Sequence, residues 1–570
     1  MRVSSALLLA LASGVTSSQG ACQPRQELDC SSPVDAGSLI FVGEDAGADM
    51  KAFCRDNASG AEVEFFTIRE TPLVHLDLPC LCGVTDSIFV TGNPELVDLT
   101  GLDNLSKIGG GIVVESNPRL ESLTGLPLDA TLGATSHHQS ISIVENRSLV
   151  DLAGLPQAST ELIGSIRVDN NARLTTLFGL PPGLTSVQGI SIGGNPELTS
   201  LEGLPQGIVT IDGVLSVSGG GRLRDLVGLP VALERVEDNV RFSGLESLAG
   251  IPPGLASIKG DLTISSNTGI VDLVGLPDNL SVGGMLEIRN NDRLVDLTGL
   301  PATIRIGAEP WTGDSLRVRD NQSMVDLAGM PATLSTIPGN VLIEGNPSLV
   351  DLAGLFEYVD IIAGSLSIIE NHALVDLSGL PEGLKLGVDV LGSSLVIAEN
   401  DGLERLSGFP VSMEALPGSL GIAGNSALLD LSGLSPLQRV AGDVVLGRRD
   451  GHGLGDPCDW ELNPGGTSLQ SLAGLSSLET VGGSLAIVCN PALGSLKAFS
   501  SLQAIGGDLL LWHNGALADI TGLGGPQGTL TDLGGTFGVL CSPLLDLDEV
   551  LGVLDNIVDP VPLSIQLMCN

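Results

Sequence analysis

The chain has 570 residues, of which 43% are hydrophobic and 3% aromatic, and its formal net charge is −41. The apolar fraction excludes a disordered chain, and the length allows a large core or several domains. The charge argues against a nucleic-acid partner, because phosphates would be repelled. It fits a soluble extracellular surface with cationic partners, and a solvated acidic face is the simpler interpretation.

The N-terminal sequence MRVSSALLLALASGVTSSQGA has the features of a secretory signal peptide. Arg2 gives a short positive region, residues 6–15 are mostly apolar, and small residues follow. The apolar run is too short to span a membrane, and no later run of about 18 apolar residues occurs. We therefore expect residues 1–21 to be removed and the chain to be secreted or held at the cell surface. Cys22 stands where a bacterial lipoprotein would be lipidated, so a lipid anchor there is the alternative to free secretion.

Nine cysteines gather toward the two ends of the chain and predict disulfide-stapled caps. The odd number leaves one thiol over, which agrees with lipidation of Cys22. Zinc is the weaker alternative, because Cys80-Leu-Cys82 lacks the usual two-residue gap. The eight disulfide candidates are Cys30, Cys54, Cys80, Cys82, Cys458, Cys489, Cys541 and Cys569.

Residues 22–84 are predicted to form a cysteine-rich N-terminal cap with one strand-like run at 63–66. Residues 85–525 carry 17 copies of a repeat, most of them 24 or 25 residues long. A fixed period in this range indicates a solenoid, in which each copy is one coil. Residues 526–570 are predicted to form a C-terminal cap. Helical spacing of apolar residues at 542–558 predicts a helix there that packs on the last coil.

One repeat, SLSIIENHALVDLSGLP at residues 365–381, shows how a coil is built. Leu366 and Ile368 alternate with outward residues, which predicts a short strand that stacks into a parallel sheet about 4.8 Å from its neighbours. Leucines at three-residue spacing then line a second wall, a glycine suits a tight corner, and a proline prevents a helix. Both spacings are needed because one coil contains a strand, a bend and an irregular wall.

Two polar positions recur along the repeats. An asparagine at the bend is predicted to point inward and to bond backbone groups that the turn leaves unpaired. It occurs at Asn93, Asn117, Asn146, Asn171, Asn195, Asn267, Asn291, Asn321, Asn346, Asn371, Asn400, Asn425, Asn490 and Asn514. An aspartate before the second wall leucine is predicted to cap turn amides. It occurs at Asp98, Asp151, Asp225, Asp272, Asp296, Asp326, Asp351, Asp376, Asp430 and Asp519. Stacked carboxylates also repel one another, so calcium between them is the alternative; otherwise we expect no cofactor.

The pattern L-x-I-x-x-N-x-x-L-x-x-L-x-G-L, preceded by glycine as in IAGSLSI and VGGSLAI, resembles the receptor L-domain, a leucine-rich-repeat-like module of receptor ectodomains. The resemblance covers about three quarters of the chain. It implies a right-handed solenoid with an extracellular, ligand-binding or scaffolding role. The chain departs from the receptors in lacking a cysteine-rich module between coils and a kinase, so neither signalling nor a ligand carries over.

Outward strand positions are the first candidates for a binding face. In the middle coils they carry five arginines, which would suit an anionic glycan or an acidic protein. These are Arg167, Arg241, Arg289, Arg317 and Arg319. The alternative is pairing with the nearby Asp169, Glu287 and Asp320. Further along, the outward positions become apolar, which marks a contact surface or a face under a loop. These are Leu342, Ile369, Val396, Ala398, Ala486, Val488, Leu510 and Trp512.

Insertions are the second candidates, because solenoid insertions map to loops on one face. Three longer copies carry extra residues just before their strand, at 136–139, 309–312 and 387–390. The largest break spans 447–466, where we expect a Cys458–Cys489 bridge to hold the loop. Its candidate ligand-binding residues are Arg448, Arg449, His452 and Trp460, because arginine and tryptophan are common hot spots. A decorative loop is the alternative.

These features predict an exported, non-catalytic repeat protein that presents an elongated face to an extracellular protein or glycan. The first alternative is a structural envelope or matrix component that self-associates through the apolar positions. The second is a polysaccharide lyase or hydrolase on a β-solenoid. The repeats show no nucleophile elbow, P-loop or zinc-protease motif, which disfavours an enzyme.

Overall fold

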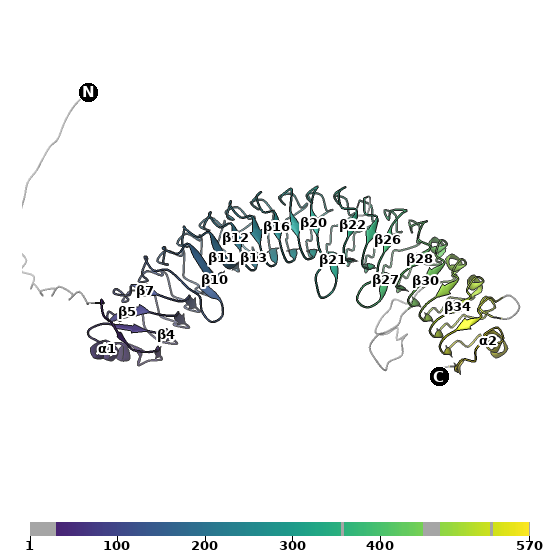
Figure 1. Cartoon of the computed structure of the whole chain (residues 1–570), viewed down its shortest axis with the longest axis horizontal. Helices are drawn as coiled ribbons and strands as arrows, with labels where there is room; N and C mark the ends of the chain where they lie inside the picture. The colour runs from purple at the N-terminus through teal and green to yellow at the C-terminus, as the bar shows by residue number, and fades with distance from the viewer. Residues whose placement is uncertain (1–29, 355–357, 448–467, 525–527, 569–570) are drawn as a thin grey trace, which may run out of the picture.

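The computed structural model describes residues 30–354, 358–447, 468–524 and 528–568. The chain forms an arch of stacked coils, with the N-terminal coils at one end and α2 near the other (Figure 1). The coils share one long ladder of parallel strands, here called the main ladder. Its strands are, in order, β2 (Leu39–Val42), β4 (Phe66–Arg69), β6 (Ile88–Thr91), β8 (Ile112–Glu115), β9 (Gln139–Val144), β10 (Glu161–Asp169), β11 (Ser186–Gly193), β13 (Leu215–Ser218), β15 (Val240–Ser243), β17 (Leu262–Ser265), β19 (Leu286–Arg289), β21 (Asp314–Arg319), β23 (Asn340–Glu344), β25 (Leu366–Ile369), β27 (Ser393–Ala398), β29 (Ser419–Ala423), β31 (Val444–Gly447), β33 (Leu485–Val488), β35 (Leu509–Trp512), β37 (Phe537–Leu540) and β38 (Leu563–Gln566).

The strands form where the sequence alternates, as the repeat predicts. In β25, Leu366 and Ile368 are fully buried, while Ser367 and Ile369 are partly exposed on the other face. Leu366 lies opposite Leu395 of β27, so the inward residues of successive coils stack directly. The inward residues and the leucine wall form one continuous core. The predicted parallel-strand solenoid is confirmed, and the main strands from β6 to β35 correspond to the 17 predicted repeats. The strands of the two end regions bring the solenoid to about 20 coils.

A second, shorter set of strands precedes the main strand in many coils, which the sequence did not predict. Two-residue strands are too short to show a period of two. They are β1 (Val34–Asp35), β3 (Ala61–Val63), β5 (Leu81–Val84), β7 (Lys107–Ile108), β12 (Thr210–Ile211), β14 (Arg235–Val236), β16 (Ser257–Ile258), β18 (Ser281–Val282), β20 (Arg305–Ile306), β22 (Thr336–Ile337), β24 (Ile361–Ile362), β26 (Lys385–Leu386), β28 (Ala415–Leu416), β30 (Arg439–Val440), β32 (Thr480–Val481), β34 (Ala504–Ile505) and β36 (Asp532–Leu533). The coil therefore has a second hydrogen-bonded wall.

An asparagine bend follows most of the main strands and confirms the predicted inward ladder. Asn371 is fully buried, and its Nδ2 donates to the Ile343 and Ile369 carbonyls at 3.0 and 2.9 Å. The residue before it, Glu370, has φ +56°, a left-handed conformation that turns the chain inward. The side chain thereby pairs backbone groups that the bend would leave unsatisfied.

The leucine wall closes each coil on the side after the bend. Leu374 and Leu377 are fully buried, and the corner residue Gly379 has φ +107°. A Cβ at Gly379 would lie 2.4 Å from the Leu352 carbonyl carbon of the previous coil, so only glycine fits there. In the last coils the wall contains three short 3-10 helices, η1 (Ser432–Leu434), η2 (Ala473–Leu475) and η3 (Lys497–Phe499).

The N-terminal part joins the solenoid instead of merely covering it. Strands β2 and β4 extend the main ladder before residue 85, and the expected run at 63–66 is divided between β3 and β4. Helix α1 (Ala46–Asp56) takes the place of a leucine wall and buries Ala46 and Met50. These coils lack the repeat pattern because Phe66 takes an inward strand position and Thr71, which donates to Asn93 Oδ1, stands in place of the asparagine.

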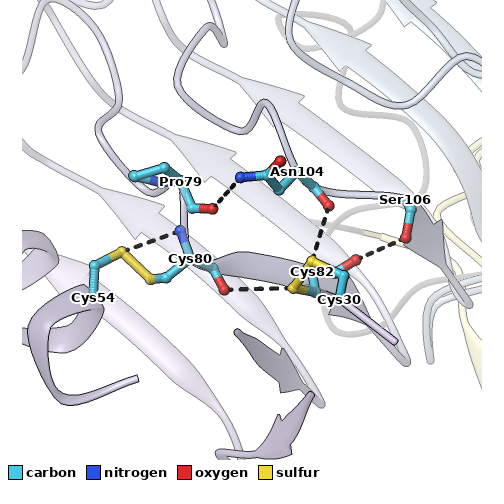
Figure 2. The surroundings of a disulfide bond; sticks show 7 residues. All are labelled: Cys30, Cys54, Pro79, Cys80, Cys82, Asn104 and Ser106. Carbon is cyan, nitrogen blue, oxygen red and sulfur yellow. Dashed lines mark hydrogen bonds between the residues drawn. A yellow bond between two sulfur atoms is a disulfide. The ribbon is translucent and has the colours of Figure 1, made fainter. Parts of the chain in front are cut away.

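Two disulfides staple these first coils, Cys30–Cys82 and Cys54–Cys80 (Figure 2). In the same figure, the Asn104 side chain donates to the Pro79 carbonyl at 2.6 Å and the Ser106 hydroxyl donates to the Cys82 carbonyl at 3.1 Å. The next coil is therefore tied to the disulfide segment. Cys489 and Cys541 are also disulfide-bonded, whereas Cys22, Cys458 and Cys569 lie outside the described residues.

The C-terminal part also continues the ladder, through β37 and β38 beyond residue 525. The predicted helix exists but is shorter, α2 (Leu547–Leu554), and Asp546 caps its N-terminus through Asp548 N. It buries Val550 and Val553, whereas Leu544 and Leu551 of the predicted apolar face are exposed. The helix begins five residues later than expected, and Leu545, Leu554 and Ile557 of the predicted apolar face also pack against the core. No helix in the described ranges is long and apolar enough to cross a membrane.

Candidate functional site: the outward face of the main ladder and its loops

The outward arginines of the middle coils form an ion-pair network around one carboxylate. Glu287 of β19, whose side chain is only 9% exposed, pairs with Arg289 at 3.1 Å and with Arg319 of the next strand at 3.0 Å. The Arg319 Nε and Nη2 both donate to Glu287 Oε1. The ladder register places Arg289 beside Arg319, so the two guanidinium groups share one carboxylate. The group keeps one net positive charge.

The other arginines differ in their partners. Arg167 pairs with Asp169 at 2.7 Å, as expected. Arg317 pairs with Asp314 of its own strand, so the expected partner Asp320 is wrong. Arg241 is exposed and has no ion pair with any residue in the described ranges. Pairing is thus the rule on this face, and Arg241 is the exception.

An acidic position borders this network. Glu344 of β23 lies directly opposite Arg319 in the ladder. Burial raises the pKa of Glu344, and the nearby Glu370 and Asp320 raise it further, while Arg319 and Arg317 act in the opposite direction. The edge of the arginine network therefore carries a carboxyl group that accepts a proton more readily than an ordinary glutamate.

From β25 to β37, the outward positions of the described main strands carry no charged residue. Ile369 and Val396 are partly exposed there, as is Leu342 of β23. Ala486 and Val488, however, are only 1% and 2% exposed, so the expected exposed apolar stripe is interrupted at β33. Trp512 is partly buried in the same small cluster, because its ring lies over Gly538 of the following coil. The face changes from charged to apolar along the ladder.

The three insertions before main strands share one internal design. In the second loop, Glu309 Oε2 accepts hydrogen bonds from Trp311 N at 3.0 Å and Thr312 N at 2.6 Å. In the third, Asp389 Oδ1 accepts from the amides of Leu391 and Ser393, both at 2.8 Å. In the first loop, Thr135 Oγ1 accepts hydrogen bonds from the backbone amides of His137 and Gln139. Each loop is therefore held in one conformation by a side chain at its base.

A glycine of the following coil leaves room for the first residues of each loop. A Cβ at Gly418 would lie 2.8 Å from Val388 Cγ1, and one at Gly339 would lie 3.0 Å from Ala308 Cβ. Gly164 stands in the same relation to Ala134, at 2.8 Å. The loops next to β21 and β27 project from the inner side of the arch (Figure 1). As expected, they fall at the same place in the coil.

The aspartates before the second wall leucine cap turns, as predicted. Asp376 Oδ1 accepts from Ser378 N at 2.9 Å, and Asp430 Oδ1 accepts from Ser432 N at 2.9 Å. The same bond to the amide two residues on is present at the other eight positions. Within the described residues, no three acidic, histidine or cysteine side chains gather as a metal site. Calcium therefore stays an untested alternative.

A further surface feature was missed from the sequence. The Gly-Leu-Pro corners of successive coils enclose an open groove of about 820 Å³ lined by Phe178, Val227, Val231 and several prolines. Glu202 is its only charged lining residue. The sequence signal for this groove was the presence of apolar residues, such as Phe178, Val227 and Val231, at corner positions that face solvent. In the sequence alone these residues cannot be told from ordinary variation between repeats. The candidate residues Arg448, Arg449, His452 and Trp460 lie outside the described residues.

No family model matches the chain, and no curated protein matches it. Among solved structures, YopM from Yersinia enterocolitica WA-314 is 19% identical over 88% of this chain and 85% of that chain, with a TM-score of 0.34. CroV588, described as a novel circular leucine-rich-repeat protein, is 14% identical over 92% of this chain and 98% of its own, with a TM-score of 0.16. Because both TM-scores are low, the fold is assigned from the ladder of parallel strands and not from these two structures.

Proposed function

We propose that the protein is exported and presents the outward face of its main ladder to an extracellular protein or glycan, without catalysing a reaction. The observation that carries the proposal is the group of Arg289 and Arg319 on the nearly buried Glu287. Glu287 holds two guanidinium groups in fixed positions beside Glu344, on a chain whose net charge is −41. A held guanidinium suits a carboxylate or sulfate of an acidic ligand, because bidentate bonds need fixed geometry.

The architecture supports this role. A solenoid of stacked coils gives an extended surface that a globular domain of equal mass does not have. The two N-terminal disulfides agree with an oxidising, extracellular compartment, because such bonds are rare in the cytosol. The resemblance to receptor L-domains adds the same expectation of an extracellular binding role.

The test is binding of the purified mature chain to an array of acidic glycans and cell-surface proteins, once with calcium and once with a chelator. A hit in both buffers supports the proposal, and a hit lost only with chelator would show that the aspartate positions bind calcium. No hit in either buffer contradicts ligand binding and favours the structural, self-associating alternative. Turnover of an acidic polysaccharide would instead support the lyase alternative.

A further inference from the structure

Two loop tips expose large apolar side chains to an unusual degree. Trp311 is 87% exposed and Leu391 is 88% exposed, and Val390 beside Leu391 is also exposed. Their loops are not loose, because Glu309 and Asp389 bond the tip amides from within. Apolar side chains that are held rigidly in water lose little entropy on binding, which is typical of contact residues.

The two tips have a defined separation along the arch. The Trp311 loop precedes β21 and the Leu391 loop precedes β27, with β23 and β25 between them in the ladder. Three inter-strand steps of about 4.8 Å place the tips roughly 14 Å apart along the axis. Any surface that binds both must offer apolar contact over at least this length.

The Gly-Leu-Pro groove offers such a length. Its lining runs from Gln157 in one coil to Pro253 four coils later, which corresponds to roughly 19 Å at the same spacing. Phe178 and Val231 are exposed on its walls. Glu202 is the single charged residue of the lining, although the chain as a whole is strongly acidic.

We propose that the Trp311 and Leu391 tips of one copy of the chain dock in the Gly-Leu-Pro groove of a second copy. The groove is longer than the distance between the tips, and the side chains that would touch are apolar on both copies. The carboxylates close to the contact are Glu309 and Asp389, which bond the amides of their own loops, and Glu202 of the groove, so repulsion between two acidic chains is limited there. The loops project from the inner side of the arch (Figure 1), and the groove lies along the Gly-Leu-Pro corners of the coils. A flat lipid surface fits this side less well than a rod does.

The contact is heterologous, because the tips and the groove are different parts of the coil. Each bound copy keeps one free set of tips and one free groove, so association continues into an open chain of copies unless its geometry closes a ring. A tryptophan and a leucine bury only a few hundred Å² per partner, which is below the size of a stable interface. The association is therefore weak, reversible and dependent on concentration.

The test is sedimentation velocity of the mature full chain from about 1 µM to about 1 mM, because so small a contact is expected to bind weakly. The tip variant carries Trp311→Ser and Leu391→Ser, and the groove variant carries Val227→Asp and Val231→Asp. The matched controls are Val274→Asp, at the coil position of Val227 but outside the groove, and Val411→Ser, an exposed valine away from both loops. We expect the native chain and both controls to associate, and each test variant to lose at least about tenfold in association constant. Circular dichroism verifies that all variants fold.

A mixture of the tip variant and the groove variant tests most directly whether the tips bind in the groove. The tip variant keeps an intact groove and the groove variant keeps intact tips, so an equal mixture is expected to form a 1:1 complex that cannot extend. A native chain that stays monomeric, association that survives both variants, or a mixture that stays monomeric overturns the inference. The inference is independent of the acidic ligand, since a monomeric chain that still binds the array would leave the proposed function intact.

Discussion

Asn371 Oδ1 accepts two hydrogen bonds from Asn346 of the preceding coil, from its backbone N at 3.2 Å and from its Nδ2 at 3.2 Å. Asn371 in turn donates its backbone N to Asn400 Oδ1 at 2.9 Å. All three side chains are fully buried. The coils are thus joined by a buried polar ladder, in which each side chain satisfies the backbone of its own coil and of its neighbour.

Replacing Asn371 with alanine is expected to destabilise the coils on both sides. The change removes the buried hydrogen bonds from Asn346 N and to the Ile343 carbonyl, whereas the Ile369 carbonyl keeps its bond from Gly345 N, so the expected cost is about 2 kcal/mol or more. Urea unfolding, followed by hydrogen exchange of β23, β25 and β27, measures the loss. Asn279→Ala at an exposed position is the control, with an expected change within about 0.5 kcal/mol. Equal effects of the two substitutions would show that the ladder is not stabilising.

Two glycines in one coil should respond differently to alanine. At Gly379 the backbone has φ +107°, and a Cβ would meet the Leu352 carbonyl group, so Gly379→Ala is expected to cost about 2 kcal/mol or more. At Gly383 a Cβ meets nothing within 4 Å, and no positive φ is present, so Gly383→Ala is expected to be neutral or slightly stabilising. Thermal unfolding of both variants measures the difference. A neutral Gly379→Ala would contradict the close approach of the coils at this corner.

The cap at Asp519 predicts a specific pH dependence. Burial alone would raise the pKa of Asp519, but hydrogen bonds from Thr521, Lys497 and Ser495 outweigh it and lower the pKa from 3.8 to about 2. A lowered folded-state pKa gives stability that is complete above the unfolded value and is lost as the pH falls through the folded value. After a discount for solvent screening, this amounts to on the order of 1 kcal/mol.

The stability difference between the native chain and Asp519→Asn should therefore shrink as the pH falls from about 4 to about 2. Urea unfolding at a series of pH values over this range measures it. A difference that stays constant across the range would mean that the ionised carboxylate contributes nothing to the cap.

The N-terminal disulfides are expected to stabilise the first coils locally. Cys54–Cys80 closes a separation of 26 residues, and its loss through Cys54→Ala and Cys80→Ala should cost about 3–4 kcal/mol. Solenoid coils contact only their neighbours, so hydrogen exchange should rise in β2, β4 and α1 but not in β25. A uniform rise along the chain would contradict this local coupling.

The sequence predicted what recurs. Asn371, Asp376 and Gly379 stand at fixed places in the repeat, and most coils carry the same residue at each place, so their buried, capping and corner roles followed from the period and from simple backbone chemistry. Features that occur once were missed. Helix α1 and the coils of β2 and β4 have no repeat pattern, because Phe66 takes an inward strand position and Thr71 stands in place of the asparagine.

The candidate face shows the same limit. Sequence distance gave the Arg167–Asp169 and Arg289–Glu287 pairs, because residues two apart on a strand point to the same side. It did not give Arg317–Asp314, which depends on how a loop enters β21. Nor did it predict that Ala486 and Val488 are covered, since burial of an outward residue depends on segments that are remote in the chain.

The central claim is that the guanidinium groups of Arg289 and Arg319, which Glu287 holds in place, bind an acidic ligand. The most direct measurement compares array binding by the native chain with binding by a variant carrying Arg289→Glu and Arg319→Glu, next to a control with Arg305→Glu on a short strand. The account predicts that the double variant loses its acidic hits by at least about tenfold, while the control retains them. Equal binding by all three chains would contradict the claim.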